Sequence, residues 1–202
     1  MLPQLSYGPV LLRALRRRDA RAWVAERLAN EQWLRPWESV PIGQSWVSWS
    51  ERHSVAGFHQ LVRQQRQGVR AAQQIPYGVF LDGRLAGQVN VMNVVHGAFN
   101  SAHLGYWVSQ RVAGRGVMPT AVALLADHAF AAGLHRLEAN IRPENTASIR
   151  VVQKVGFQPE GRRRRYLAVD GQYRDHDGWV LLAEDLPGGV LAALVAAGRS
   201  VR

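Results

Sequence analysis

The most informative part of the chain is GYWVSQRVAGRGVMPTAVALL, residues 105–125. It begins as a strand and ends as a helix, with a short glycine-containing turn between them. Gly114 and Gly116 allow backbone angles that other residues avoid, and the first N–H groups of the helix have no partner within it. These N–H groups, at the positive end of the helix dipole, form a site for an anion such as a pyrophosphate. Arg111 and Arg115 can add charge-assisted hydrogen bonds.

The loop at residues 111–116 matches neither of two common phosphate-binding motifs. It lacks the Gly-Lys-Ser/Thr of a Walker loop and the third glycine of a dinucleotide fingerprint. On its own, Arg-x-x-Gly-x-Gly also fits an ordinary glycine-containing loop. The surrounding elements must therefore distinguish the two interpretations.

The flanking sequence predicts strands and helices mixed along one domain. Alternating apolar residues around Asp-Gly pairs are typical of β-hairpins, and apolar residues at helical spacing between a capping side chain and a glycine indicate helices. Ser45 is the expected N-cap of the helix predicted over residues 45–67. We predict an α/β domain, with mixed α and β elements around one sheet, over residues 1–186 and a short helical extension over 187–202. The predicted strands are 10–15, 77–81, 85–95, 101–108, 137–141, 163–169 and 174–182, and the predicted helices are 20–30, 45–67, 117–132 and 146–155.

Composition restricts the class of protein. The apolar fraction of 47% is enough for a core, and the chain lacks the run of about eighteen apolar residues that a membrane span needs. No cysteine is present, which excludes disulfides, thiolate metal sites and a cysteine nucleophile. We expect a soluble, cytoplasmic protein without a metal site. The net charge of +10 favours contact with an anionic partner.

A second segment, ANIRPENTASIRVVQKVGF at residues 139–157, contains Asn145 and the closing Lys154 and Gly156. Together with the loop at 111–116, it resembles the two motifs of the GNAT superfamily of acetyltransferases. The resemblance implies the GNAT fold, a central twisted mixed sheet of about seven strands with splayed fourth and fifth strands and helices on both faces. It also implies acetyl-CoA as the cosubstrate.

Within that superfamily, the chain most resembles the RimJ-type ribosomal-protein-alanine N-acetyltransferases. Four segments match that group in order and spacing: NEQWLRPWE at 30–38, NVVHGAF at 93–99, HLGYWV at 103–108 and YLAVDGQYRDH at 166–176. The resemblance covers residues 10–183. It implies direct acetyl transfer from acetyl-CoA to the N-terminal α-amine of a protein, with a ribosomal protein as the expected partner.

The resemblance also implies two sets of binding residues. In GNAT folds the pantetheine arm lies between the splayed strands and bonds to their backbone. The coenzyme site would comprise Trp107, Val108, Arg111, Val112, Gly114, Arg115, Gly116, Val117 and Asn145. The acceptor groove would include Trp33, Trp37, Tyr106 and Asp175. Trp33 and Trp37 can equally anchor their loop to the core.

Ser148 is the expected hydrogen-bond donor to the departing thiolate. Many family members carry a tyrosine for this purpose, but Val152 occupies that position here. The Rim group often has Asn-x-x-Ser instead, which Asn145 and Ser148 match. The same two residues also suit the start of a helix, as the cap and a first-turn residue.

His103 is the candidate base, because several relatives have a glutamate at this position. A neutral imidazole can accept a proton, directly or through water. A peptide α-amine has a pKa of about 7.7–8.0 and is partly neutral near pH 7, so it depends less on a base than a lysine would. A lone histidine in a strand also has a structural interpretation. His176, beside Asp175, is a weaker candidate for the acceptor site.

The densest positive run consists of four arginines at residues 162–165. It can contact ribosomal RNA or an acidic protein surface electrostatically, and a solvated start of a strand explains it as well. Two other functions stay open, namely acetylation of a small amine or antibiotic, and a GNAT-like module that binds ribosome or nucleic acid with weak catalysis. The oligomeric state stays open too.

Overall fold

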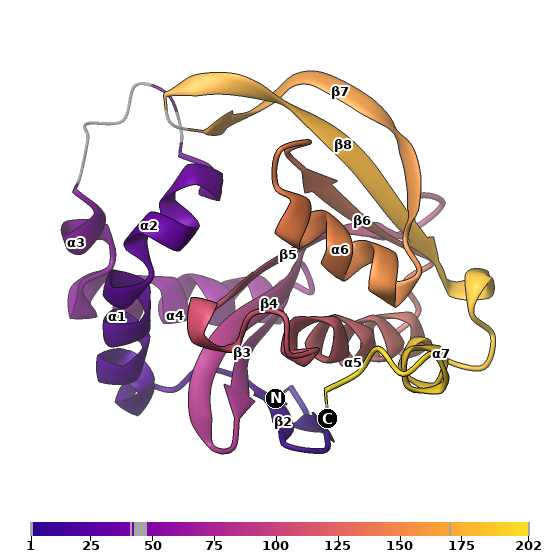
Figure 1. Cartoon of the computed structure of the whole chain (residues 1–202), viewed down its shortest axis with the longest axis horizontal. Coiled ribbons are helices and arrows are strands. Elements are labelled where there is room, and N and C mark those ends of the chain that lie inside the picture. The colour runs from indigo at the N-terminus through magenta and orange to yellow at the C-terminus, as the bar shows by residue number, and fades with distance from the viewer. Residues whose placement is uncertain (1, 41, 43–47, 170, 202) are drawn as a thin grey trace.

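The computed structural model describes residues 2–40, 42, 48–169 and 171–201, which form one central sheet with helices on both faces (Figure 1). The sheet has eight strands in the order β1-β2-β3-β4-β5-β6-β8-β7. Neighbouring strands are antiparallel except for the parallel pair β5 and β6. The strands are β1 (Leu5–Tyr7), β2 (Val10–Arg13), β3 (Ile75–Leu81), β4 (Arg84–Val95), β5 (Ser101–Val108), β6 (Arg136–Ile141), β7 (Gln158–Val169) and β8 (Gln172–Leu182). The mixed α/β class is confirmed, and the sheet is one strand larger than expected because β1 precedes the first predicted strand.

The α-helices are α1 (Ala20–Ala29), α2 (Glu31–Leu34), α3 (Trp49–Arg52), α4 (Val55–Arg70), α5 (Val117–Ala131), α6 (Thr146–Val155) and α7 (Val190–Ala196). Four 3₁₀ turns are described: η1 (Arg17–Asp19), η2 (Arg35–Trp37), η3 (Gln110–Val112) and η4 (Ala183–Asp185). None of these helices is both long and apolar enough to cross a membrane.

Each face of the sheet has its own apolar cluster. On one face, α1 and α4 pack Trp23, Phe58 and Val62 against Phe80 and neighbouring strand residues. On the other face lies the larger cluster beneath α5, α6 and α7. Every residue of α5 from Val117 to Ala126 is buried, as expected of a helix that is apolar all round and is covered on both sides.

The helix predicted over 45–67 is interrupted at His53 and Ser54, between α3 and α4. Ser48 caps α3 by accepting from Glu51 N–H, and Ser54 caps α4 by accepting from Gly57 N–H. The expected cap Ser45 lies outside the described residues, as does Asp170 in the turn between β7 and β8.

The C-terminal segment contains the predicted short helix, α7, and it packs on α5. The Asp127 carboxylate of α5 accepts from Val190 N–H at 2.7 Å and from Leu191 N–H at 3.0 Å. Beyond α7 the chain turns back, and Val201 N–H donates to Thr120 Oγ1 at 2.9 Å. Val201 is buried in the larger core.

The strands β5 and β6 diverge at one end. Their pairing extends from Ser101 opposite Arg136 to His103 opposite Glu138, and the rest of β5 has no partner on β6. These strands correspond to the fourth and fifth strands of the expected fold, counted without β1. The predicted splay is therefore present, and it exposes one edge of β5 between residues 104 and 108.

Candidate active site

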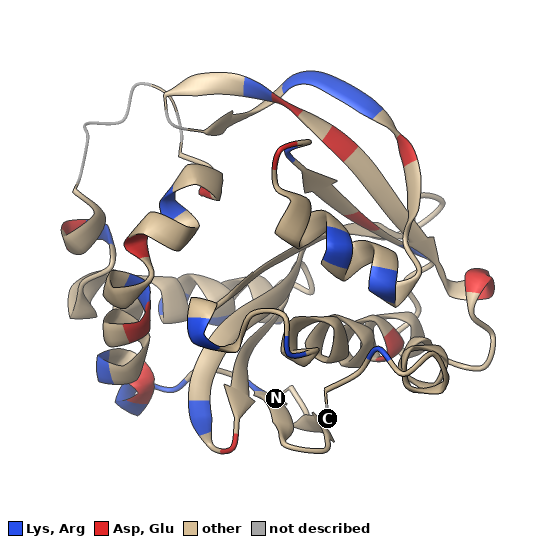
Figure 2. Ribbon diagram, in the orientation of Figure 1, with Lys and Arg blue, Asp and Glu red and all other residues tan. Residues whose placement is uncertain are grey.

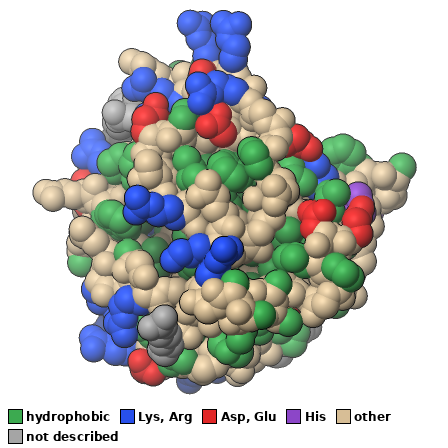
Figure 3. Space-filling view, turned by 45° about the vertical axis from the view of Figure 1, so that its right-hand side comes forward, with side chains coloured by type: hydrophobic (Ala, Val, Ile, Leu, Met, Phe, Trp, Pro, Cys, Tyr) green, Lys and Arg blue, Asp and Glu red, His purple; other side chains and the backbone are tan. Residues whose placement is uncertain are grey.

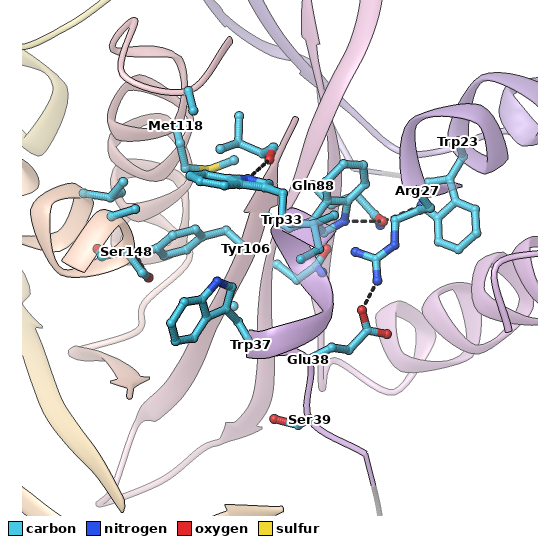
Figure 4. Close-up of a pocket in the computed structure, with 18 of the residues that line it drawn as sticks. Trp23, Arg27, Trp33, Trp37, Glu38, Ser39, Gln88, Tyr106, Met118 and Ser148 are labelled. Atoms are coloured by element: carbon cyan, nitrogen blue, oxygen red, sulfur yellow. Dashed lines mark hydrogen bonds and ion pairs between the residues drawn. The ribbon is translucent and has the colours of Figure 1, made fainter. Parts of the chain in front are cut away.

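A cavity of about 1740 Å³ lies along the unpaired part of β5. A single drug-sized ligand typically occupies roughly 300–1,000 Å³, so the cavity has room for two substrates. One end is formed by the loop before α5 and by α6, and the other by α1, α2, α3 and α4. Figure 4 shows Ser148 and Tyr106 toward one end, Glu38 and Arg27 toward the other, and Trp33 and Trp37 between them.

The glycine loop forms part of the first end. Gly114 and Gly116 have φ values of 80° and 78°, in the left-handed region where a side chain is strained, and Gly116 is the N-cap of α5. The cavity is lined here by Val112, Gly114, Gly116 and Val117 among the predicted coenzyme residues. The loop therefore presents backbone and the N-terminus of a long helix, which together suit a pyrophosphate.

The two arginines of this loop do not line the cavity. The Arg111 guanidinium donates to the Leu85 carbonyl at 2.6 Å and to the Glu26 carboxylate at 3.1 Å. Arg115 is exposed and is not among the residues that line the cavity. For Arg111, the expected direct bond to a phosphate is replaced by an ion pair that anchors the loop to α1.

Cations from α6 lie at this end instead. Arg150 and Lys154, one helical turn apart, both line the cavity and are the two basic positions of α6 visible in Figure 2. Figure 3 shows blue basic side chains gathered across the middle of the face that it draws. Lys154 was expected only as part of a motif, and Arg150 was not predicted for the site, although the spacing of four residues between them is a usable signal.

The first turn of α6 connects Ser148 to Tyr106. The Asn145 side chain caps the helix by accepting from Ser148 N–H at 3.1 Å. The Ser148 hydroxyl donates to the Tyr106 hydroxyl at 2.8 Å, and that hydroxyl donates to the Ser148 carbonyl at 3.0 Å. Burial raises the pKa of Tyr106, so the phenol stays protonated. Tyr106, predicted for the acceptor groove, is thus joined to Ser148.

The backbone of β5 presents N–H donors along its exposed edge. Ser109 N–H donates to the Ala86 carbonyl at 2.8 Å, which fixes the register of β5 on β4. Successive strand residues direct their backbone groups to opposite edges, so those of Val108 face the gap beside β6 and those of Trp107 face β4. The Val108 carbonyl accepts from Trp33 Nε1 at 3.1 Å, leaving the Val108 N–H for a ligand.

Trp33 and Trp37 line the middle of the cavity. Trp33 is held by its bond to β5, and the Trp37 ring lies 5.4 Å from the Arg142 guanidinium, measured from the ring centroid. Arg142 also donates to the Pro36 carbonyl at 3.1 Å. Both tryptophans therefore have an anchoring role in addition to forming a wall of the cavity.

A buried charged cluster lies at the second end. Arg27, only 5% exposed, is paired with Glu38 and lies 2.7 Å from His53 Nε2. Its guanidinium is also 4.8 Å from the centroid of the Trp49 ring. Burial alone would raise the pKa of Glu38, but the hydrogen bond with His53 and the charge of Arg27 hold it below its ordinary value. The carboxylate is therefore ionised and neutralised within the cluster.

Two amides of β4, Gln88 and Asn90, also line this end. Gln88 is 3% exposed and accepts from two indoles, Trp23 Nε1 at 2.6 Å and Trp107 Nε1 at 3.0 Å. The Asn90 side-chain oxygen is buried and has no partner among the described residues. Neither amide was predicted from the sequence, although polar side chains at alternate positions of a central strand are a recognisable signal.

His103 and Asp175 are not among the described residues that line the cavity. His103 Nε2 lies 3.4 Å from a Glu138 oxygen, and its Nδ1 lies 3.3 Å from the Asn93 amide. Asp175 accepts from Arg165 N–H at 2.8 Å in the β7–β8 hairpin. The structure therefore does not bring either residue together with Ser148. His176 is buried in the same hairpin, and its burial lowers its pKa.

The described residues contain no group of three or more side chains placed to hold a metal ion. The described lining of the cavity also offers no cluster of unpaired carboxylates that would suggest one, since Glu38 is committed to Arg27 and His53.

Comparison with known proteins agrees with this arrangement. A family model described as an acetyltransferase (GNAT) domain matches residues 10–158. The chain is 29% identical over 177 residues to the [ribosomal protein uS5]-alanine N-acetyltransferase of Escherichia coli, covering 86% of this chain and 87% of that protein. It is 27% identical over 167 residues to the spermidine N(1)-acetyltransferase of the same organism, covering 82% of each.

Solved structures show the same relation. Mycobacterium smegmatis RimJ, in complex with CoA-disulfide, has a TM-score of 0.91 and 41% identity, covering 99% of this chain and 96% of that one. The family match over residues 10–158 shows that the chain belongs to the GNAT family of acetyltransferases.

Proposed function

We propose that this acetyltransferase moves the acetyl group of acetyl-CoA directly to the N-terminal α-amine of a ribosomal protein. The carrying observation is one continuous cavity, which joins the glycine loop before α5 to the aromatic wall formed by Trp33 and Trp37 along the exposed edge of β5. The likeness to the uS5-alanine enzyme over most of both chains supports the class of acceptor.

The residues at the loop end fit the coenzyme. A Cβ on Gly114 would meet nothing within 4 Å, so the loop is open on the side where phosphate oxygens would approach. The backbone of Gly114, Gly116 and Val117 would hold the pyrophosphate, with Arg150 and Lys154 supplying positive charge. When bound, acetyl-CoA supplies an acetyl thioester, and the Val108 N–H is placed to donate to its carbonyl oxygen.

The Tyr106 and Ser148 hydroxyls would stabilise the departing thiolate. Each hydroxyl has one proton to donate. In the structure the Ser148 hydroxyl donates to the Tyr106 hydroxyl, and the Tyr106 hydroxyl donates to the Ser148 carbonyl. Rotation of either hydroxyl frees a donor for sulfur. Because burial raises the pKa of Tyr106, its part is to donate a hydrogen bond to the thiolate rather than to transfer a proton fully.

The amine needs little help from a base. An α-amine with a pKa of about 7.7–8.0 is neutral in a useful fraction near pH 7, and its proton can pass to water after attack. His103 faces Glu138 outside the described lining of the cavity, so direct proton transfer to it is not part of this mechanism.

Contact with the ribosome would be electrostatic. Arg164 and Arg165 are exposed on β7 and pair with no carboxylate of a described residue, whereas Arg162 pairs with Asp177 and Arg163 with Glu138. With the net charge of +10, this exposed pair is suited to phosphate groups of ribosomal RNA.

The test is intact-mass analysis of ribosomal proteins incubated with the enzyme and acetyl-CoA. We expect one ribosomal protein to gain a single acetyl group, mapped by fragmentation to its N-terminal residue. If coenzyme binds and no ribosomal protein gains mass, while spermidine is acetylated, the acceptor is a small amine and the proposal is wrong.

A further inference from the structure

The orientation of the Gln88 amide is fixed by two tryptophans from different elements. Trp23 on α1 and Trp107 on β5 both direct an indole N–H at the Gln88 oxygen. A flipped amide would place its own N–H groups against these donors, so only one orientation is allowed. The Gln88 nitrogen forms no hydrogen bond with any described residue, and Gln88 lines the cavity. Its two N–H groups are therefore the donors left for a ligand.

Asn90 supplies the complementary group. Its buried side-chain oxygen accepts nothing from a described residue, and an unpaired buried acceptor costs about 1–3 kcal/mol. Asn90 stands opposite Gly105 on β5, and the Met92 methyl lies over Gly105, 2.8 Å from the position that a Cβ there would take. Methionine is a flexible side chain, so a ligand N–H that displaces this methyl would satisfy the Asn90 oxygen.

The two amides form one row. Gln88 and Asn90 are two residues apart on β4, on the same face, with an expected separation of about 6.7 Å. An extended peptide repeats its backbone groups at the same interval. The row lies opposite Trp107 and Gly105, beside the exposed edge of β5 to which the thioester would bind.

We infer that Gln88 and Asn90 bind the main chain of the acceptor's N-terminal residues, and that this pair selects a peptide over a carbonyl-free amine. Gln88 donates to a peptide carbonyl, and Asn90 accepts from the attacking amine or the next peptide N–H. A polyamine has no carbonyl, so it would leave the Gln88 donors unpaired. The inference rests on the proposed function and names the chemistry by which that site recognises its acceptor.

The charges at this end agree with a peptide. A polyamine carries several ammonium groups and favours unpaired carboxylates. Of the carboxylates in the described lining, Glu38 pairs with Arg27, Glu144 pairs with Arg142 and Glu51 accepts from Ser48. Arg27 and Arg52 share the one Glu38 carboxylate, and Arg63 also lines this part of the cavity, so the excess of positive charge would repel additional cations.

The test uses Gln88→Glu, which is nearly isosteric. A carboxylate keeps both indole hydrogen bonds and loses the two N–H donors. Release of CoA would be followed with hexapeptides beginning with Ala, Ser or Thr, and with spermidine as the carbonyl-free acceptor. We expect kcat/KM for the peptides to fall roughly tenfold, mostly through KM, without a fall for spermidine. The dissociation constant for CoA should not change.

Two controls make the result specific. Gln67→Glu adds the same charge at an exposed position of α4 outside the described lining, and it should behave as the wild type. Asn90→Leu removes the second amide without charge and should also raise KM for the peptides. Thermal unfolding of each variant identifies any loss that comes from misfolding.

The outcomes separate the two proposals. If the wild type acetylates peptides but Gln88→Glu and Asn90→Leu leave their kcat/KM within twofold, only this inference is wrong. A fall of equal size for peptides and spermidine would overturn it as well. If the wild type acetylates spermidine and none of the peptides, the proposed function itself fails.

Discussion

At the scale of single residues, Tyr106 was predicted for the acceptor groove, and the structure joins it to Ser148 instead. The tyrosine that many GNAT enzymes carry on the helix is Val152 here, and Val152 is fully buried in the core. A phenol nevertheless reaches Ser148, from β5 instead of α6. The hydroxyl function is therefore present in the cavity, delivered by a different element.

This arrangement predicts a ranking of variants. Tyr106→Phe should lower kcat roughly 10–100-fold with little change in KM for acetyl-CoA, because it removes a hydrogen bond of about 1.5–3 kcal/mol to the charged leaving group. Ser148→Ala should have a smaller effect, since Tyr106 can still donate. Steady-state kinetics of both single variants and the double variant would check this. A Ser148→Ala loss as large as that of the double variant would assign the function to Ser148 alone.

At the scale of elements, the end of the β5–β6 pairing is held by a buried carboxylate. Glu138 on β6 accepts from Arg136 on the same strand at 3.0 Å, from Asn140 at 3.1 Å, and from Arg163 on β7. Burial alone would raise the pKa of Glu138, but the bonds from Arg163, Asn140 and Arg136 lower it to about 2. The network joins β6 to β7 at the point where β5 separates.

The sign of the pH effect follows from that shift. A carboxylate whose pKa is lowered in the folded state stabilises the protein at any pH above the pKa of the same group in the unfolded chain, which is near 4.5 here. This contribution is lost as the pH falls toward about 2, the pKa of Glu138 in the folded state. Glu138→Gln should lower the free energy of unfolding at pH 7 by up to roughly 3 kcal/mol, and the difference from wild type should shrink between pH 4.5 and 2.

Urea unfolding followed by tryptophan fluorescence at pH 7, 4 and 3 measures this difference. Glu160→Gln is the matched control, because Glu160 bonds the same Arg136 but is largely exposed, and it should cost less than about 1 kcal/mol. A pH-independent difference for Glu138→Gln would contradict the assignment.

At the scale of the whole molecule, Ser200 and Val201 lie against the glycine loop before α5. A Cβ on Gly116 would lie 2.6 Å from the Ser200 carbonyl, and the next residue, Val201, bonds to Thr120 on α5. The backbone of Ser200, 84 residues later in the sequence, therefore packs against the loop at Gly116. Gly114, with nearly the same φ, has open space instead.

The two glycines give a matched pair of variants. Gly114→Ala and Gly116→Ala impose a similar backbone strain of about 1–3 kcal/mol, but only Gly116→Ala also displaces the C-terminal segment. We expect Gly116→Ala to cost at least about 1 kcal/mol more in urea unfolding and to weaken CoA binding. Removing residues 200–202 should abolish that excess cost. Equal costs for both variants in the full chain would show that the segment does not support the loop.

The sequence by itself determined the features that depend on local chemistry. Glycines before a helix, a strand beforehand and the Asn145 cap are neighbours in the chain, so their geometry follows from backbone angles and unpaired N–H groups. The resemblance that these motifs carry, rather than local chemistry, implied the family and the splay. It also implied a place at the cavity for Trp33, Trp37 and Ser148, which line it together with Gly114 and Gly116.

Only the tertiary structure decided where several side chains point. Arg111 does not line the cavity, because it pairs with Glu26, 85 residues earlier. Gln88 is oriented by the indole of Trp23, 65 residues away. A charged or amide side chain takes the partner that satisfies it, and such partners come from distant elements that only folding brings together. Local sequence names the residue types available to a site, whereas long-range packing selects which of them face the substrate.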